Sequence, residues 1–438
     1  MKILSIAAGA AGMYCGSCLR DNALAAEMRK QGHDVILLPL YTPLLTDEKS
    51  VAIDRVFFGG ISIYLKQQYP AFRKLPRFFD KLWDSRWALK MASKSSIPTS
   101  PEMLGGLTVA TLQGRDGALQ GEVDKLVDWL KHEPLPDVVN LPNSLLISLA
   151  EPLRSALGRP VCVTLSGEDL FLEGLPEPYK SQSLELIRKH SAHVEAFIAT
   201  SNYYADFMSD YLRIPRSKIE VVPLGINLEG LSAELRIPTN CFTVGYFARV
   251  CPEKGLHLLA EAYRKLRRET DFSGATLEAA GYLAAEHKPY LTRIEQEMKD
   301  AGLEREFQYR GALDRARKID FLRNLSVISV PSPYAEPKGL YLLEAMACGV
   351  PYIQPNHGAF PELHEKAGAG WLFEANSVDH LAEVIYSAWR DQHASMDLGK
   401  RGVPAVNEHF TIERSAQRLL EVYGNMSARE ETVGRSRI

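Results

Sequence analysis

Short apolar runs alternate with longer amphipathic stretches along the first half of the chain. The run 3–7 leads into a stretch with helical spacing, 18–31, which ends at Gly32. The next apolar run, 34–40, reads DVILLPL. Further candidate strands are 107–112, 137–141, 160–165, 196–200 and 219–223. Because strands that alternate with helices pair in parallel, this half is predicted to consist of βαβ units.

The alternation restarts in the second half, after a segment of different character. Residues 231–240 (LSAELRIPTN) combine a proline with polar residues, which is typical of a linker. The runs that follow predict strands at 243–247, 275–280, 307–310 and 327–330 and helices at 256–268, 290–301, 318–324 and 411–423. The chain is therefore predicted to be an α/β protein with two Rossmann-like, doubly wound domains.

Composition and charge narrow the class of protein. The 438 residues suffice for two domains, and 46% hydrophobic with 24% charged residues is typical of a soluble globular chain. A net charge of −3 provides no basic field for nucleic acid. Six cysteines in so long a chain favour a reducing compartment, and no apolar run reaches the length of a membrane span. We expect a cytoplasmic protein.

The segment 332–351 (SPYAEPKGLYLLEAMACGVP) contains the strongest candidate site. Glu336 and Glu344 are eight residues apart, after the apolar run 327–330 and at the start of a predicted helix. The N–H groups of a helix N-terminus suit a phosphate, and carboxylates accept hydrogen bonds from sugar hydroxyls. Together they predict a nucleotide-sugar site. The alternative is a capped surface helix whose first turn favours acids.

This segment resembles the E-x7-E motif of the retaining GT-B glycosyltransferases of family 4. Where the family has EPFG, this chain has EPKG, with a lysine at the aromatic position. The resemblance implies two domains that face each other across a cleft, with a C-terminal helix that returns to the N-domain. Glu336 would then hold the donor sugar, Glu344 the ribose, and the N–H groups of Gly339 and Leu340 the sugar or β-phosphate.

The resemblance implies the following domain organisation. We expect an N-terminal, acceptor-side domain (1–230) with a basic aromatic insertion (55–105), a linker (231–240), a nucleotide-sugar-binding domain (241–405), a helix that crosses back (406–426) and a tail (427–438).

Two basic residues follow the first strand of the second domain, Arg249 and Lys254. The family has an Arg/Lys pair at this place. A guanidinium and an ammonium can stabilise the negative charge that develops on a diphosphate leaving group. The resemblance therefore makes Arg249 and Lys254 catalytic candidates. The alternative is a solvated basic pair at a turn.

The N-terminal loop and the strand 160–165 supply further candidates. Gly16 aligns with the family's loop glycine, counted back from GHDV, although Cys15 stands where a second glycine is usual. Arg20 is either an anchor for an anionic group or a surface arginine. The sequence CGSC at 15–18 resembles the thioredoxin redox motif, or consists of small residues in a tight loop.

The family often has a histidine near the donor sugar, at the position of Ser166. Either Ser166 replaces it as a polar contact, or the substrate role moves to Glu168 or Asp169.

Basic and aromatic side chains are interleaved in residues 63–94. The segment contains eight lysines and arginines, among them Arg73, Lys74 and Arg77, but only two aspartates. Seven aromatic residues are distributed among them. Such a segment can contact a membrane, bind an acceptor or close as a lid, or simply pack. The first of these options would place the protein at the inner face of the plasma membrane as a peripheral protein.

The resemblance implies a retaining glycosyltransferase that moves a sugar from a nucleoside-diphosphate-sugar to a saccharide or lipid-linked glycan. It implies no cofactor beyond the substrate and no metal, and the sequence has no DxD triplet. Three other interpretations stay open: glucan elongation like that of glycogen or starch synthases, a non-catalytic GT-B protein that binds a ligand, and a thiol redox protein.

Overall fold

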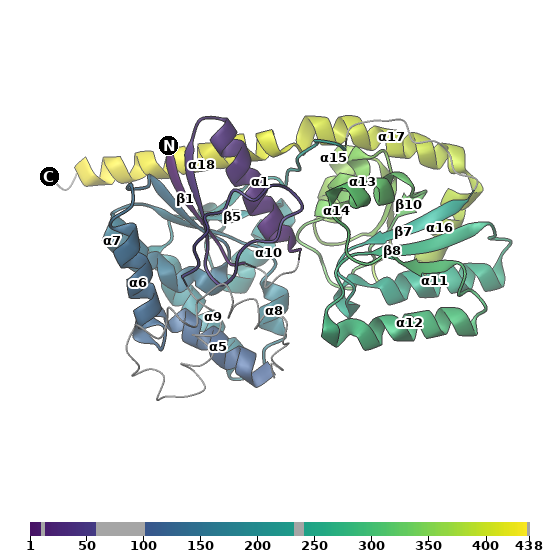
Figure 1. Ribbon diagram of the computed structural model, residues 1–438, viewed down its shortest axis with the longest axis horizontal. Coiled ribbons are helices and arrows are strands. Elements are labelled where there is room, and N and C mark those ends of the chain that lie inside the picture. The colour runs from purple at the N-terminus through teal and green to yellow at the C-terminus, as the bar shows by residue number, and fades with distance from the viewer. Residues whose placement is uncertain (10–13, 58–100, 232–240, 436–438) are drawn as a thin grey trace. The chain divides into compact units, whose positions relative to one another are not determined.

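The computed structural model describes the chain except for residues 10–13, 58–100, 232–240 and 436–438. It forms two compact units (Figure 1). The first consists of Met1–Pro223 with Ser415–Ile438, and the second is Leu224–Arg414. Most of the expected insertion and linker, with Arg73, Lys74 and Arg77, lies outside the described residues.

Six parallel strands form the sheet of the first unit, in the order β2-β1-β3-β4-β5-β6. They are β1 (Lys2–Ala7), β2 (Asp34–Pro39), β3 (Val138–Leu141), β4 (Val161–Thr164), β5 (Ala196–Ala199) and β6 (Ile219–Val221). All residues of β3, β4 and β5 are buried, as expected for a sheet covered on both faces. The order reverses at β1, so the carboxyl ends of β1 and β3 form a switch point, where such sheets bind ligands.

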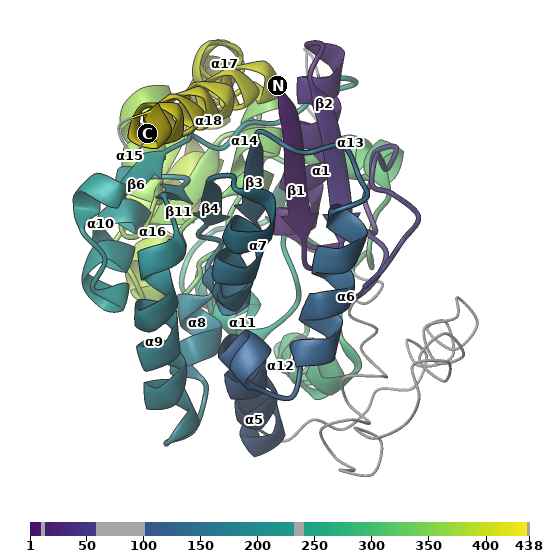
Figure 2. The ribbon, with the colours of Figure 1, turned by 90° about the vertical axis from the view of Figure 1, so that its left-hand side faces the viewer.

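Helices cover both faces of this sheet (Figure 2). One face carries α1 (Gly16–Lys30) and α18 (Ile412–Arg435). The helices of the other face are α6 (Gln120–Leu130), α7 (Ala150–Leu157), α9 (Tyr179–His190) and α10 (Asn202–Leu212). This division follows from right-handed crossovers, because β1–β2 and β3–β6 run in opposite directions across the sheet. Helix α18 is attached to β6, since Arg418 Nη2 lies 2.9 Å from Glu220 Oε2.

The strand expected at 107–112 is wrong, because these residues belong to helix α5 (Pro101–Gln113). Three β-branched residues, Thr108, Val109 and Thr111, favoured the strand. In the helix, Thr108 Oγ1 donates to the carbonyl of Leu104 and Thr111 Oγ1 to that of Leu107. A Cβ at Gly105 would lie 2.5 Å from the ring of Tyr179, so α5 packs closely on α9. Tertiary packing of one helical face therefore overrides local β-propensity.

The C-terminal region also differs from the prediction of one helix (406–426) and a tail (427–438). Helix α17 (Gln392–His409) ends before Phe410, and α18 then runs through Arg435. The interruption at Phe410 has a tertiary cause, because Ile226 N donates to Phe410 O and Ile412 N donates to Ile226 O. Met426, the last residue of the expected helix, is buried, and Ser427 Oγ donates to Tyr423 O one residue beyond it, where the helix continues.

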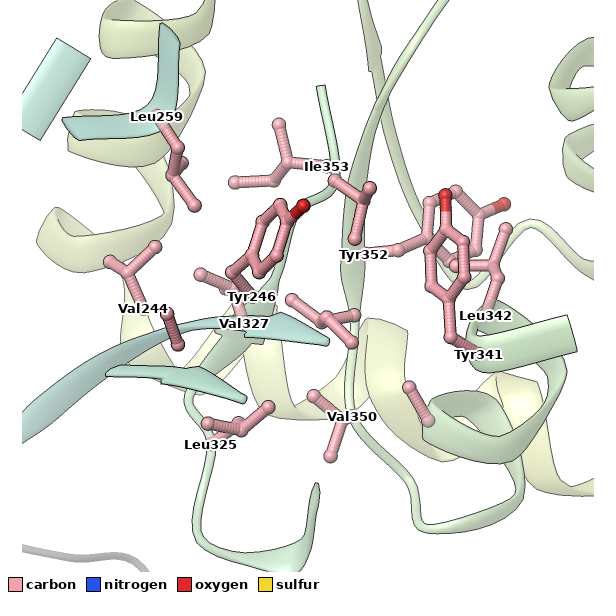
Figure 3. Close-up of a cluster of buried hydrophobic side chains, with 14 of the residues drawn as sticks. Val244, Tyr246, Leu259, Leu325, Val327, Tyr341, Leu342, Val350, Tyr352 and Ile353 are labelled. Carbon is pink, nitrogen blue, oxygen red and sulfur yellow. The ribbon is translucent and has the colours of Figure 1, made fainter. Parts of the chain in front are cut away.

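The second unit has its own six-stranded parallel sheet, in the order β12-β11-β10-β7-β8-β9. Its strands are β7 (Phe242–Phe247), β8 (Ala275–Ala280), β9 (Phe307–Tyr309), β10 (Val327–Ile328), β11 (Tyr352–Pro355) and β12 (Gly370–Phe373). Its other helices are α11 (Leu256–Glu269), α12 (Lys288–Asp300), α13 (Arg315–Arg323), α14 (Leu340–Ala347), α15 (Phe360–Ala367) and α16 (Val378–Arg390). Side chains from β7, β10, β11, α11 and α14 meet in one core (Figure 3).

A glycine brings the loop after β7 against the loop after β10. Gly255 has φ +73°, and a Cβ there would lie 2.0 Å from the carbonyl oxygen of Pro331. The two loops therefore approach more closely than any other residue would allow. They carry most of the residues expected in the candidate site.

Gly255→Ala is expected to destabilise the second unit more than Gly302→Ala. Both glycines have φ +73°, so both variants carry the same left-handed strain of about 1–2 kcal/mol. At Gly302 a Cβ meets nothing within 4 Å, whereas at Gly255 it collides with backbone. Melting temperatures of the two variants measure the difference. Equal losses would show that the loop contact is not tight.

Candidate functional site

A buried ion pair joins the loops that follow β7 and β10. Lys254 is the last residue of a 3₁₀ turn, Pro252–Lys254, and Glu336 lies in the loop between β10 and α14. Lys254 Nζ is 2.6 Å from Glu336 Oε2, and both residues are buried. Removing two charges from water costs several kcal/mol per ion, so each partner depends on the other.

Two neighbours fix this pair. Ser332 Oγ donates a hydrogen bond of 3.1 Å to Glu336 Oε2, and Lys254 Nζ lies 3.1 Å from Tyr334 OH. The same ammonium lies 5.2 Å from the centroid of the Tyr334 ring, within the range of a cation–π interaction. Two of the three N–H groups of Lys254 are thus engaged by partners that the structure shows, as is one oxygen of Glu336.

The loop after β11 holds the backbone of Glu336. A Cβ at Gly358, which has φ +64°, would lie 2.5 Å from the carbonyl oxygen of Glu336. The same oxygen accepts from Ala359 N at 2.9 Å. His357 Nε2 lies 3.0 Å from the carbonyl of Ser332, and burial lowers the pKa of His357. A neutral ring with Nε2–H donating to Ser332 satisfies both observations.

A second buried ion pair holds Glu344. Lys318 Nζ, on α13, is 2.6 Å from Glu344 Oε1, on α14. Lys318 and Glu344 are both buried. Both acids of the motif are therefore paired with a lysine from a different element.

The other expected residues of the second unit have different surroundings. Gly339 caps α14 with φ 155°, and Leu340 is the first residue of that helix. Arg249 is exposed, and its carbonyl accepts from Tyr246 OH at 2.7 Å. The structure thus brings Lys254 and Glu336 together, and anchors Arg249 through its backbone.

Arg20 is a buried residue of the first unit, so the surface interpretation is wrong. Its Nε and Nη2 donate to Asp21 Oδ1 at 3.0 and 2.7 Å. Its Nη2 also donates to Ser166 Oγ at 3.3 Å, and Ser166 Oγ donates to the carbonyl of Pro142. The structure therefore joins two expected residues, Arg20 and Ser166.

The carboxylates of Glu168 and Asp169 accept hydrogen bonds from other residues of the first unit. Glu168 Oε2 accepts from Ser166 N at 2.6 Å and Oε1 from Ser144 N at 2.8 Å, so its carboxylate clamps two loops. Asp169, the first residue of α8 (Asp169–Glu173), accepts from Tyr204 OH at 2.7 Å. Burial raises the pKa of Asp169, and the Tyr204 hydrogen bond opposes it. This geometry favours positioning roles over substrate contact.

Gly16 begins α1 at the switch point of the first sheet. It is exposed, and a Cβ there would meet none of the residues that the structure describes within 4 Å. The helix therefore offers an open N-terminal turn to a ligand.

The described residues contain neither a membrane-spanning helix nor a cluster of metal-binding side chains. In that part of the chain, no helix is long and apolar enough to span a membrane. The same residues contain no group of three or more His, Cys, Asp or Glu side chains that could hold a metal ion.

Two family descriptions match adjoining parts of the sequence. "Glycosyltransferase Family 4" matches residues 114–229, and "Glycosyl transferases group 1" matches residues 229–403. Together they cover one continuous stretch of more than half of the chain, including both ion pairs. The chain is a GT-B glycosyltransferase of family 4. The expected family and the expected glycosyltransferase class are thereby confirmed, and the two parallel α/β sheets fit the expected GT-B fold.

Known proteins with similar sequences and structures agree with this assignment. The glycosyltransferase is 25% identical to α-maltose-1-phosphate synthase of Mycolicibacterium smegmatis over 296 residues, which are 59% of this chain and 75% of that one. It has the fold of sucrose-phosphate synthase from Thermosynechococcus elongatus, with a TM-score of 0.71, 18% identity and coverage of 98% and 100%. HepE of Anabaena, solved in complex with UDP-glucose, has a TM-score of 0.65, 17% identity and coverage of 97% and 100%.

Sequence reasoning found Lys254, Glu336 and Glu344 but missed the residues that hold them. Lys318 lies four residues before the buried Leu322, so helical spacing already placed it on the inner face of α13. A lysine on an apolar face is a signal for a buried acid nearby. No comparable signal marks Tyr334 or His357, because their partners come from loops distant in sequence.

Proposed function

We propose that this glycosyltransferase moves a hexosyl group from a nucleoside-diphosphate-sugar to an acceptor with retention of the anomeric configuration. The buried pair of Lys254 and Glu336 carries the proposal. Such a pair contributes little to stability compared with apolar residues of the same volume, so a role in the reaction is the better explanation. The UDP-glucose bound to the Anabaena neighbour supports a nucleotide-sugar donor.

In this proposal the two members of the pair have different tasks. Lys254 has a third N–H beyond those directed at Glu336 and Tyr334, and this proton is available for a diphosphate oxygen. Glu336 Oε1 is available for a hydroxyl of the donor sugar, because Ser332 and Lys254 bind Oε2. Charge that grows on the leaving diphosphate is then stabilised by a fixed ammonium, with Arg249 as a second cation.

Glu344 and the start of α14 bind the rest of the donor in this proposal. Glu344 accepts hydrogen bonds from the ribose, and Lys318, whose Nζ lies 2.6 Å from Glu344 Oε1, holds its carboxylate in place. The N–H groups of Gly339 and Leu340 face the sugar or β-phosphate, at the positive end of the helix dipole. Transfer proceeds without a protein nucleophile and without a metal, since cationic side chains supply the charge.

The acceptor in this proposal is a saccharide or a lipid-linked glycan, bound by the first unit. The names of the Mycolicibacterium and Thermosynechococcus relatives both contain a saccharide phosphate, which favours a hydrophilic acceptor. Arg20 and Ser166 lie near the switch point where such a ligand binds.

The test of the donor class is a thermal-shift panel of UDP-glucose, GDP-mannose and ADP-glucose. A donor at 100 times its Kd stabilises the folded state by about 2.7 kcal/mol. Hydrolysis of the stabilising donor without acceptor, with the product anomer identified by NMR, tests retention. An inverted product excludes retention, and a panel without any shift excludes these donors.

Glu344→Gln is expected to weaken donor binding by about 1–3 kcal/mol, the contribution of a hydrogen bond to a charged group. The amide keeps the volume of the side chain and can still accept from Lys318, but the buried ammonium loses its charge partner, so the melting temperature is measured alongside. Calorimetry with the donor from the panel measures the loss. The control is Glu365→Gln, an exposed residue of α15. Unchanged affinity in Glu344→Gln would remove Glu344 from the donor site.

A further inference from the structure

Two cysteines lie at the start of α1. Cys15 is the N-cap residue, with φ −117° and ψ 125°, and Cys18 is the third residue of the helix. An N-cap side chain naturally reaches the third helical residue, as in a capping box. The two thiols accordingly share a hydrogen bond, and neither cysteine forms a disulfide.

The two cysteines differ in exposure. Cys15 is half-buried and Cys18 is buried. The hydrogen bond with Cys15 is the main reason why the pKa of Cys18 is raised, and burial adds to it. A helix N-terminus stabilises a thiolate, and at this helix the accessible sulfur is that of Cys15. An accessible nucleophile beside a buried, protonated thiol is the arrangement that dithiol exchange requires.

The other four cysteines lack this arrangement. Cys162, Cys251 and Cys348 are buried, and burial is the main cause that raises the pKa of each. Cys241 is half-buried like Cys15, but its Sγ contacts Thr276 Oγ1 at 3.8 Å and the residue lies just before β7. It therefore provides a matched control for exposure alone.

We infer that Cys15 and Cys18 form a thiol–disulfide exchange site, which a small-molecule disulfide of the glutathione class oxidises to an intramolecular disulfide. The Cys15 thiolate attacks one sulfur of that disulfide, so that a mixed disulfide forms and one small thiolate leaves. Cys18 then loses its proton and attacks Cys15 Sγ, which releases the second small thiol. Two protein S–H bonds become one S–S bond, and two electrons reduce the small disulfide to two thiols.

The mixed disulfide itself activates the second step. Once Cys15 is bound to the small thiol, its charge and its hydrogen bond to Cys18 are lost. The largest cause that raises the pKa of Cys18 disappears with them. The Gly9 backbone hydrogen bond, which favours the Cys18 thiolate, remains. The pKa of Cys18 should therefore fall once Cys15 has reacted, which favours the attack of Cys18 on Cys15 Sγ.

The test incubates the full chain with defined ratios of oxidised to reduced glutathione, followed by acid quenching and mass spectrometry. Both cysteines lie in one tryptic peptide, residues 3–20, which should lose two hydrogens on oxidation and regain them on reduction. Cys18→Ser should accumulate a glutathione adduct on Cys15, because no resolving thiol is present. Cys15→Ser should accumulate none on Cys18, and Cys241→Ser should oxidise as the wild type does.

Several results would overturn the inference. One is a peptide 3–20 that stays reduced at every ratio. Another is an adduct on Cys18 in the Cys15→Ser variant. If Cys18→Ser misfolds, Cys18→Ala serves the same purpose, since alanine is a good helix former. None of these readouts uses a sugar donor.

Oxidation should also affect donor binding, and this consequence rests on the proposed function. The disulfide would enclose Gly16 and Ser17 at the start of α1, whose N-terminal N–H groups suit an anionic group such as the diphosphate of the proposed donor. By linkage, a donor that binds the reduced form better also protects the thiols from oxidation. Calorimetry with UDP, GDP and ADP on reduced and oxidised protein measures the coupling.

Equal affinity of both forms would exclude the coupling. If the reduced form binds none of the three nucleotides while peptide 3–20 still oxidises, the proposed donor fails and the exchange site stands.

Discussion

Lys254→Met is expected to lower kcat by about 10²–10³-fold, the effect of removing one fixed charge donor from a developing oxyanion. Methionine keeps the apolar stem of the side chain but removes the ammonium that lies 2.6 Å from Glu336 and 3.1 Å from Tyr334. Only charge that grows in the transition state is affected, so kcat should fall more than donor affinity. Steady-state kinetics with the donor identified by the thermal-shift panel give both values.

The control for this prediction is Lys265→Met. Lys265 is paired with Asp379 on the surface of the same unit, and a pair of that kind contributes little. Its kcat and melting temperature should match those of the wild type. Turnover near the wild-type value in Lys254→Met would contradict the role of Lys254. Adding Glu336→Gln to Lys254→Met should lower kcat by less than the product of the single effects, because the two groups act as a unit.

Lys318→Met is expected to destabilise the second unit by about 3–5 kcal/mol, the usual cost of breaking a buried ion pair. The change leaves the carboxylate of Glu344 buried without its ammonium, which lies 2.6 Å away in the structure. Amide hydrogen exchange in α13 and α14, together with the melting temperature, measures the loss. Donor affinity should fall as well, because the carboxylate of Glu344 loses the partner that holds it in place.

The double variant Lys318→Met with Glu344→Leu separates stability from function. Replacing a buried ion pair by apolar residues of similar volume is often neutral or stabilising, so the double variant should regain stability. It should not regain donor binding, because the acceptor of the ribose hydrogen bonds is gone. A double variant that recovers both would show that the pair only holds α13 against α14.

The sequence predicted a large part of the candidate site. Glu336 and Glu344 follow a short buried strand, and Lys254 follows another, so their place at the carboxyl ends of parallel strands could be read from local patterns. What the two lysines pair with could not be predicted in this way. Lys254 reaches Glu336 across 82 residues of sequence, and Lys318 reaches Glu344 across 26 residues. A pairing between distant residues depends on the register of whole elements.

Contacts between distant residues also explain why the role of Glu168 in the first unit could not be predicted. Glu168 was expected as one of the residues that replace a histidine, because a carboxylate in that loop suits a sugar. In the structure, the carboxylate accepts backbone N–H groups of Ser166 and Ser144. Backbone donors are present in every sequence, so no residue pattern could have revealed them.

The sequence by itself determined the alternation of elements and their order, because the spacing of apolar residues specifies which face of each element is buried. It also determined where the acids and bases stand relative to strand ends. The tertiary structure decided between strand and helix at 107–112, where α9 accepts one face of α5. The tertiary structure also separated α17 from α18 at Phe410 and paired both acids of the motif with lysines. Each of these outcomes depends on contacts between segments far apart in the chain, and their energies exceed local propensities of a few tenths of a kcal/mol per residue.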